Sequence, residues 1–240
     1  SGRLSLSPDK IPMAAAFTAR FGVIGKTEML LPIPGEPTFV QNGTLLLRYD
    51  AAKGNGWTLT GDLEGFRRAD IRLAKLAVDG NGRVLQPGNG PDEPAKIDGT
   101  VGFNASGVDL GDPALNAAIG DSVIGHTDLN WEQGKPLGLR NLSINAGGVE
   151  VAGDLALTQK GLDVEVGGTI DAKAPDIARF SALAGRDLGG GVTFSGSGKA
   201  AILSRTFDIE ARVSGRALSV GQENLDRLLA TQSTIEVSAR

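Results

Sequence analysis

The residues whose types could do chemistry are few in this chain, and their spacing matches no known catalytic arrangement. The only histidine, His126, lies on the polar side of an alternating stretch, together with Asp128 and opposite Leu129 and Trp131. A lone histidine in such a place is far more often solvated than catalytic. No serine sits in a G-x-S-x-G elbow. A hydrolase that uses His126 remains an alternative, and it requires serine or aspartate side chains that converge on the ring.

Metal and phosphate chemistry are equally poorly represented. The chain has no cysteine, no HExxH pattern and no calcium-binding loop of the EF-hand type. The glycine-rich stretch 185–191 follows a predicted helix and precedes a predicted strand, whereas a phosphate-binding loop needs the opposite order. The sequence therefore predicts no enzyme, no metal site and no cofactor.

Composition narrows the possible partners. The 240 residues carry a net charge of −4 and give a pI near 5.1, so no basic surface predicts binding to nucleic acid. No run reaches the roughly 18 apolar residues that span a bilayer. The chain starts with Ser1, without an initiator methionine or a signal peptide. We therefore expect an excised fragment whose membrane anchor lies elsewhere in the parent protein.

The elements that must position any site are mainly strands. Residues alternate between apolar and polar over 57–64, 162–166 and 207–214, which is typical of antiparallel sheet with one buried and one solvated face. Glycine, at 35 residues, marks frequent turns. We expect turns at 53–56, 79–82, 147–148 and 159–161.

Three short helices are expected between strands. Asp112 and Pro113 predict a helix that Gly120 ends, and Pro175 opens a second one that ends at Gly185. The third runs over 222–230, with leucines on one face. We expect each helix to cover an end or edge of the sheet.

The first hundred residues are less regular. Strands are predicted over 45–49, 57–66 and 71–78, with a β-bulge between Leu73 and Leu76 where the apolar phase shifts. The proline-rich stretch 31–37 predicts a loop or sheet edge, and 86–94 a long exposed loop.

A strand–helix–strand unit is repeated at 99–131, 162–199 and 207–240, after an irregular β-rich segment over 1–98. Tandem units of this kind bury their apolar faces against their neighbours and give extended sheets. The predicted fold is mostly β, an elongated curled antiparallel sheet with about three short helices, in which 1–98 continues the sheet of the repeats.

The apolar face of this sheet is the candidate site. Small residues recur on it where a packed core would have large ones: Gly61, Ala105, Gly125, Ala146, Gly168, Gly196, Gly198 and Ala211. A second sheet could close over the face as a sandwich, or the face could form an open apolar groove for acyl chains. The groove residues would be Leu59, Leu63, Val101, Phe103, Leu129, Val164, Val166, Phe194, Ile209, Val213 and Val237.

The repeats resemble a known family. Residues 112–120, DPALNAAIG, and 177–198, IARFSALAGRDLGGGVTFSGSG, are similar to segments of TamB proteins, the large subunit of the bacterial translocation and assembly module. So are 207–221, FDIEARVSGRALSVG, and 225–229, LDRLL. The likeness is strongest over 99–240 and rests on pattern, since the family has no catalytic motif.

The resemblance implies an AsmA-like, bridge-like lipid transfer protein. Such proteins are anchored in the inner membrane by an N-terminal helix, cross the periplasm as a curled sheet (a β-taco) with an apolar groove, and have an Omp85-family barrel as partner. It implies phospholipid acyl chains as the ligand and a role in outer-membrane assembly. The alternative is a β-rich spacer or adhesin-like interaction module without a lipid ligand.

Overall fold

The computed structural model describes residues 2–6, 12–22, 28–31, 36–85, 94–160, 163–201, 204 and 206–239. In these residues, antiparallel strands dominate and three short α-helices join some of them. The predicted fold class, a mostly-β antiparallel sheet with about three helices, is confirmed. The expected loop over 86–94 falls almost wholly outside the described residues, as does most of the proline-rich stretch 31–37.

Contacts group the chain into two compact units. The first comprises 1–111 and 124–135, and the second comprises 112–123 and 136–240. This grouping is not the one that the sequence suggested at residue 98. It divides the first predicted repeat, because most of the strand residues of that repeat belong to the first unit and its helix to the second.

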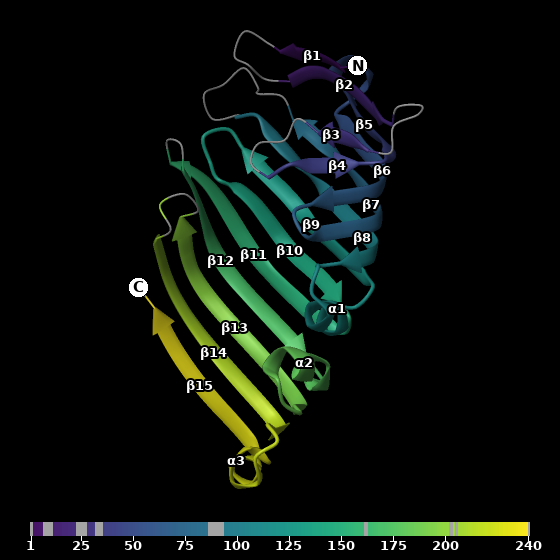
Figure 1. The fold of residues 1–240 in the computed structure, drawn as a ribbon. Helices are drawn as coiled ribbons and strands as arrows, with labels where there is room; N and C mark the ends of the chain where they lie inside the picture. The colour runs from purple at the N-terminus through teal and green to yellow at the C-terminus, as the bar shows by residue number, and fades with distance from the viewer. Residues whose placement is uncertain are drawn as a thin grey trace. The chain divides into compact units, whose positions relative to one another are not determined.

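The first unit is an antiparallel sheet. Along the sheet the order is β1-β2-β5-β6-β7-β8-β9, with β3 paired to β4 and β4 paired to the end of β6 (Figure 1). A single 3₁₀ turn, Ala51–Lys53, joins β5 to β6. The strands are β1 (Gly2–Leu6), β2 (Pro12–Phe21), β3 (Met29–Leu31), β4 (Thr38–Val40), β5 (Asn42–Asp50), β6 (Gly56–Arg68), β7 (Ile71–Leu85), β8 (Lys96–Asp109) and β9 (Ser122–Glu132), which enters this unit at Ile124.

A cluster of large side chains is buried on the apolar face of this unit. Trp57, Tyr49 and Val84 are buried together, with 8%, 6% and 5% of their surface exposed. The Trp57 indole nitrogen donates to the carbonyl oxygen of Asp98 at 3.0 Å, so its polar atom is satisfied. This cluster anchors β5, β6 and β7 to one another.

The predicted turn at 79–82 is wrong, because β7 runs straight through it. Its glycines are needed for packing instead. A Cβ on Gly82 would lie 2.6 Å from the Trp57 indole nitrogen, and one on Gly80 would lie 3.2 Å from the same ring. The glycines that resemble a hairpin turn in the sequence therefore mark the place where the Trp57 ring lies across two neighbouring strands.

The bulge expected between Leu73 and Leu76 is not present as a change of register. β7 keeps one register with β6 and one with β8 on both sides of this point. Ala74 instead lies beside Gly107, and both Gly107 and Gly65 have φ of +62°. The change in which face carries the apolar residues of β7, between Leu73 and Leu76, thus coincides with positive-φ glycines in the two neighbouring strands.

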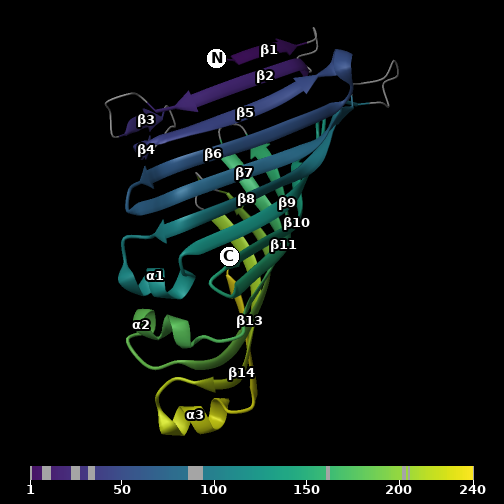
Figure 2. The same cartoon turned by 90° about the vertical axis from the view of Figure 1, so that its right-hand side faces the viewer.

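The second unit is a meander with helices at one end. Its strands follow chain order: β10 (Leu137–Ala146), β11 (Val149–Lys160), β12 (Asp163–Ala174), β13 (Gly189–Ala201), β14 (Thr206–Ser219) and β15 (Gln232–Ala239). The helices are α1 (Pro113–Ile119), α2 (Ser181–Ala184), which follows the 3₁₀ turn Ala178–Phe180, and α3 (Glu223–Leu229). Figure 2 shows the three helices along the same end of the strands.

The three predicted helices are confirmed, and caps account for the start of α1 and the end of α2. The Asp112 carboxylate accepts from the backbone N–H groups of Ala114 and Leu115, at 2.7 and 3.1 Å. Gly185 ends α2 in the left-handed region, with φ of +63°. α1 is held in this unit by Arg179, whose Nη2 donates to the Ala117 carbonyl oxygen at 3.3 Å.

Candidate functional site

The candidate site is an apolar hollow in the second unit, and two glycines form its floor. Gly168 of β12 lies directly opposite Gly198 of β13. Their φ values are +149° and +155°, a region that other residues rarely adopt. A Cβ at either position would collide with a backbone carbonyl oxygen, that of Asp154 or that of Asp208. No side chain can therefore stand at the centre of this pair of strands.

The neighbouring rows of the same face surround this floor with apolar side chains. In register, Leu155 lies beside Gly168 and Ile209 beside Gly198. Toward one end of the strands follow Val166 and Ala200, and toward the other Ile170 and then Phe194. Together these residues surround an open hollow of about 220 Å³. Besides the glycines it is lined by Leu155, Val166, Ile170, Phe194, Ala200 and Ile209, together with Ser197 and Lys199.

This face is covered only in part. Ile209, Phe207 and Ile235 expose 37%, 50% and 63% of their surface. Among the described residues of the second unit, Ala118 is the one apolar residue that is fully buried, and it lies in α1 rather than in the sheet. All six strands of the unit belong to one sheet, so no second sheet within it closes the face as a sandwich. An exposed apolar surface of this kind is typical of a binding surface.

The predicted groove residues fall into three groups. Val166, Phe194 and Ile209 meet at the hollow, and half-buried Val164 and Val213 share their face. Leu59, Val101 and Leu129 instead pack against the Trp57 cluster of the first unit.

The remaining three predicted residues lie apart from both places. Leu63 and Phe103 are half-buried on β6 and β8 of the first unit. For Val237 only the backbone is described, and it pairs with Ala211.

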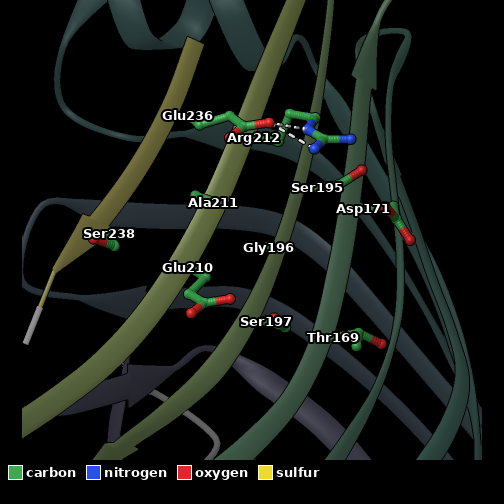
Figure 3. A pocket seen from close by; sticks show the side chains of 10 residues that line it. All are labelled: Thr169, Asp171, Ser195, Gly196, Ser197, Glu210, Ala211, Arg212, Glu236 and Ser238. Carbon is green, nitrogen blue, oxygen red and sulfur yellow. Dashed lines mark hydrogen bonds and ion pairs between the residues drawn. The ribbon is translucent and has the colours of Figure 1, made fainter.

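The opposite, polar face of the second unit carries a larger hollow, of about 730 Å³, which sequence reasoning missed (Figure 3). One row across it consists of Asp171, Ser195, Arg212 and Glu236 in direct register, and Arg212 donates to Glu236 at 2.6 Å. Alternation predicted the polarity of this face but carries no signal for its curvature. Its hydroxyl and carboxylate groups suit hydrogen bonding with a polar ligand, but they do not converge on a reactive atom.

Charges near the apolar hollow are paired across the strand ends. Lys160 donates to the Glu165 carboxylate at 2.6 Å, and this hydrogen bond, against some desolvation, holds the pKa of Glu165 below its ordinary value. Glu165 is therefore ionised at neutral pH. This ion pair lies on the polar face of β11 and β12, whereas the charged residue that lines the hollow itself is Lys199.

His126 and possible metal ligands are the remaining candidates for chemistry. His126 is exposed on β9 and lines neither hollow. No group of three His, Cys, Asp or Glu side chains in the described part of the chain is arranged to hold a metal ion. Nor is any described helix long and apolar enough to cross a membrane.

Comparison with known proteins adds no relative. The scan against protein-family models, the search of curated proteins and the search of solved structures each found no match for this chain.

Proposed function

We propose that this chain binds phospholipid acyl chains, without catalysis, on the apolar face of its second unit. The observation that carries the proposal is the hollow over Gly168 and Gly198, which is lined mainly by apolar side chains and opens to a half-exposed apolar face. A flexible hydrocarbon is the ligand that matches such a surface, because the surface offers contact area and few hydrogen-bonding groups.

The size of the hollow favours part of an acyl chain. One water molecule takes up about 30 Å³ in the liquid. A hollow of 220 Å³ therefore has room for about seven groups of this size, or a similar number of methylene groups. Each buried methylene contributes about 0.8 kcal/mol. The rest of the lipid, including its headgroup, would then lie outside the hollow. Binding of this kind is weak and non-directional, which suits passage of lipid along a surface.

The wider role that we propose follows from the sequence resemblance. In an AsmA-like protein this segment would lie in the periplasm, in a chain anchored in the inner membrane. It would pass phospholipid toward the outer membrane and support outer-membrane assembly, with an Omp85-family barrel as partner of the parent protein. The half-exposed apolar face of the second unit supports the lipid part of this proposal.

A ligand-free spacer is the second candidate, and one observation favours it for the first unit. There Leu59, Val101 and Leu129 already contact the buried Trp57 cluster, so large side chains occupy the apolar face. We therefore propose that the second unit binds acyl chains and that the first unit acts as a spacer without a ligand.

Photo-crosslinking with a diazirine-labelled fatty acid tests the proposal. Phe194→Asp and Ile209→Asp place a charge in the hollow, and each should reduce crosslinking at least tenfold because an ionised carboxylate is poorly tolerated beside hydrocarbon. Ser195→Asp is the matched control, since Ser195 neighbours Phe194 but points to the polar face. It should leave crosslinking unchanged.

The site of labelling decides between the candidates. Mass spectrometry of the crosslinked peptides should locate label within 163–174, 189–201 or 206–219. Label spread evenly over both units, or equal loss with Ser195→Asp and Phe194→Asp, would contradict binding at the hollow. Native mass spectrometry that finds no lipid on any preparation would favour the spacer.

A further inference from the structure

The turn between β5 and β6 contains a reactive pair of residues that the proposed function does not use. Asn55 is followed directly by Gly56, and both residues are exposed. In such a pair the main-chain nitrogen of the glycine can approach the side-chain Cγ of the asparagine, because glycine has no Cβ to hinder it. Asparagine is one of the thermolabile residues of proteins. The turn is therefore a candidate site of covalent modification.

The described residues contain two further Asn-Gly pairs, which serve as comparisons within the same chain. Asn42 with Gly43 begins β5, and Asn81 with Gly82 lies inside β7. Both of these asparagines are exposed, as Asn55 is. Exposure therefore does not distinguish the three pairs, and the surroundings of each glycine nitrogen must.

Gly56 lies at the end of both of its strand pairings. Val84 donates to the Asn55 carbonyl oxygen at 2.7 Å, so Asn55 and Val84 form a hydrogen-bonded pair. Hydrogen-bonded and non-hydrogen-bonded pairs alternate in an antiparallel ladder, which makes Gly56 and Arg83 a non-hydrogen-bonded pair. On the other side, the register of β6 with β5 begins only at Trp57, one residue beyond Gly56. Neither of these two strands, both fully described, therefore holds the Gly56 nitrogen.

The pair in β7 differs because Gly82 is held inside the sheet. The same alternation makes Gly82 and Trp57 a hydrogen-bonded pair, so the Gly82 nitrogen donates within the ladder. A Cβ on Gly82 would collide with the Asp98 carbonyl oxygen of β8. A Cβ on Gly56, by contrast, would lie 3.9 Å from the Gly82 carbonyl oxygen, its nearest neighbour apart from the adjoining residues. Gly56 thus has space around it that Gly82 lacks.

The pair in β5 is restrained at both reacting groups. The Asn42 side-chain nitrogen donates to a Glu64 carboxylate oxygen at 2.8 Å. Gly43 is in register with β2 on one side and with β6 on the other. Each of these two pairs must therefore open part of a sheet before its nitrogen can react, whereas the pair in the turn need not.

We propose that Asn55 is a site of spontaneous modification, at which it cyclises onto Gly56 and then opens to isoaspartate or aspartate. The Gly56 nitrogen bonds to the Asn55 Cγ, the bond from Cγ to Nδ2 breaks, and Nδ2 leaves as ammonia with the Gly56 proton. Water then adds to either carbonyl carbon of the ring and breaks the bond from that carbon to the Gly56 nitrogen. Addition at Cγ gives aspartate, and addition at the main-chain carbon gives isoaspartate. The net reaction consumes water and releases ammonia.

The isoaspartate product should loosen the buried cluster beside the turn. Its main chain runs through Cγ, so the oxygen that accepts from Val84 becomes part of a charged carboxylate on a branch. Val84 and Trp57 both belong to the buried cluster of this unit, and Trp57 directly follows Gly56. The aspartate product keeps the main chain unchanged and should leave the cluster as it is.

Incubation of the whole chain in mildly alkaline buffer made with ¹⁸O-labelled water tests the site. Peptide mapping by mass spectrometry follows the three Asn-Gly pairs in the same sample. Conversion should be at least about tenfold faster at Asn55 than at Asn42 or Asn81, since those two must first open a strand. The converted residue should carry ¹⁸O, and an isoaspartyl methyltransferase should methylate its peptide. Equal rates at the three asparagines would overturn the proposal.

Two variants separate the reaction from the fold. Gly56→Ala places a methyl group where a Cβ has open space, so the chain should keep its melting temperature while conversion slows about tenfold. Asn55→Gln requires a larger ring and should abolish conversion in the turn. An unchanged rate in Gly56→Ala would mean that the Gly56 nitrogen is not the attacking group, and would overturn the mechanism.

Hydrogen exchange tests the consequence for the cluster. The isoaspartate form, separated by ion exchange from the unmodified chain, should exchange about tenfold faster over 82–85. The Asn55→Asp variant is the matched control, because it carries the same added charge on an unchanged main chain. It should exchange at the rate of the unmodified chain. Equal exchange in the isoaspartate form and in Asn55→Asp would overturn the proposed loosening.

Discussion

The two units carry the same alternation of apolar and polar residues but use their apolar faces differently. In the first unit, Tyr49, Trp57 and Val84 are buried on that face and other apolar side chains pack on them. In the second, the described sheet has no apolar side chain that is fully buried, and glycines lie where the centre of a core would be. The first unit buries a cluster of large side chains on its apolar face, and the described sheet of the second unit does not.

The difference shows that glycine on an apolar face has two opposite meanings. A Cβ on Gly82 or Gly99 of the first unit would meet the Trp57 ring as well as a backbone carbonyl oxygen, that of Asp98 or that of Asn81. Gly168 and Gly198 of the second unit face each other, and no large ring crosses them. A glycine thus marks a groove only when no neighbouring strand supplies the side chain that fills it.

Removal of the large ring gives the largest expected effect. Trp57→Ala should cost the first unit about 3–5 kcal/mol, because it empties a buried site and removes the hydrogen bond to Asp98. Phe194→Ala in the second unit should cost only about 1–2 kcal/mol, since Phe194 is half-exposed. Urea unfolding followed by hydrogen exchange in peptides from each unit measures both. Equal losses would contradict the contrast between a filled and an open face.

A methyl group on the floor of the hollow should come next. Gly198→Ala forces a Cβ against the Asp208 carbonyl and puts alanine at φ of +155°, with an expected cost of about 1–3 kcal/mol in the second unit. Gly189→Ala, on the same strand, is the control. Its Cβ would lie 3.6 Å from that of Ser219, an ordinary contact, so the stability should change by less than about 0.5 kcal/mol. Denaturant midpoints compare the two, and a tolerated Gly198→Ala would mean that the floor can carry side chains.

Local rules predicted the elements that local chemistry controls. Asp112 and Gly120 set the ends of α1, and Gly185 sets the end of α2, through their own bonds and backbone conformation. The third helix, α3, was located from its leucine pattern instead. Alternation likewise located β6, β12 and β14, whereas β1 to β4 were not predicted. The prediction of a turn at 79–82 was wrong because its glycines make room for the side chain of Trp57, which lies more than twenty residues away in the sequence. Nothing local distinguishes a glycine in a turn from a glycine beneath a distant ring.

The candidate site was only partly predictable for the same reason. Sequence placed Leu59 and Val166 in one groove because both alternate in the same way. Register decides their surroundings: Leu59 meets the Trp57 cluster, whereas Val166 meets Leu157 and Ala200 beside two glycines. The hollow on the polar face depends on strand twist, for which alternation carries no signal.

Binding of an amphiphile should stabilise the second unit but not the first, by a smaller amount than the effects above. A single-chain C12 amphiphile below its micelle concentration, at ten times its dissociation constant, should stabilise the second unit by about 1.4 kcal/mol. Hydrogen exchange should slow over 163–174 and 189–201 and stay unchanged over 56–68. The Phe194→Asp variant should show no slowing at either place. Protection centred on the first unit would place the open face in the wrong half of the molecule.

Acid should produce the smallest effect, and mainly in the first unit. The hydrogen bond from Arg67, 2.7 Å from the Glu28 carboxylate, holds the pKa of Glu28 below its ordinary value. A lowered pKa means that this carboxylate stabilises the fold fully above its ordinary pKa and loses that contribution as the pH falls through the lowered one.

The consequence differs between the units because the two ion pairs tie different parts together. Arg67 also stacks on Phe39 at 4.2 Å. Loss of the Glu28 charge should therefore loosen β4, which pairs with β6 through two residues, and with it β3, which pairs with β4. In the second unit, Glu165 and Lys160 join strands that eleven backbone pairs already hold. Hydrogen exchange between pH 5 and pH 3 should therefore rise more over 28–31 and 38–40 than over 150–173, after correction for the intrinsic rate. In the Glu28→Gln variant that excess over 28–31 should vanish, and its persistence would assign the loosening to another group.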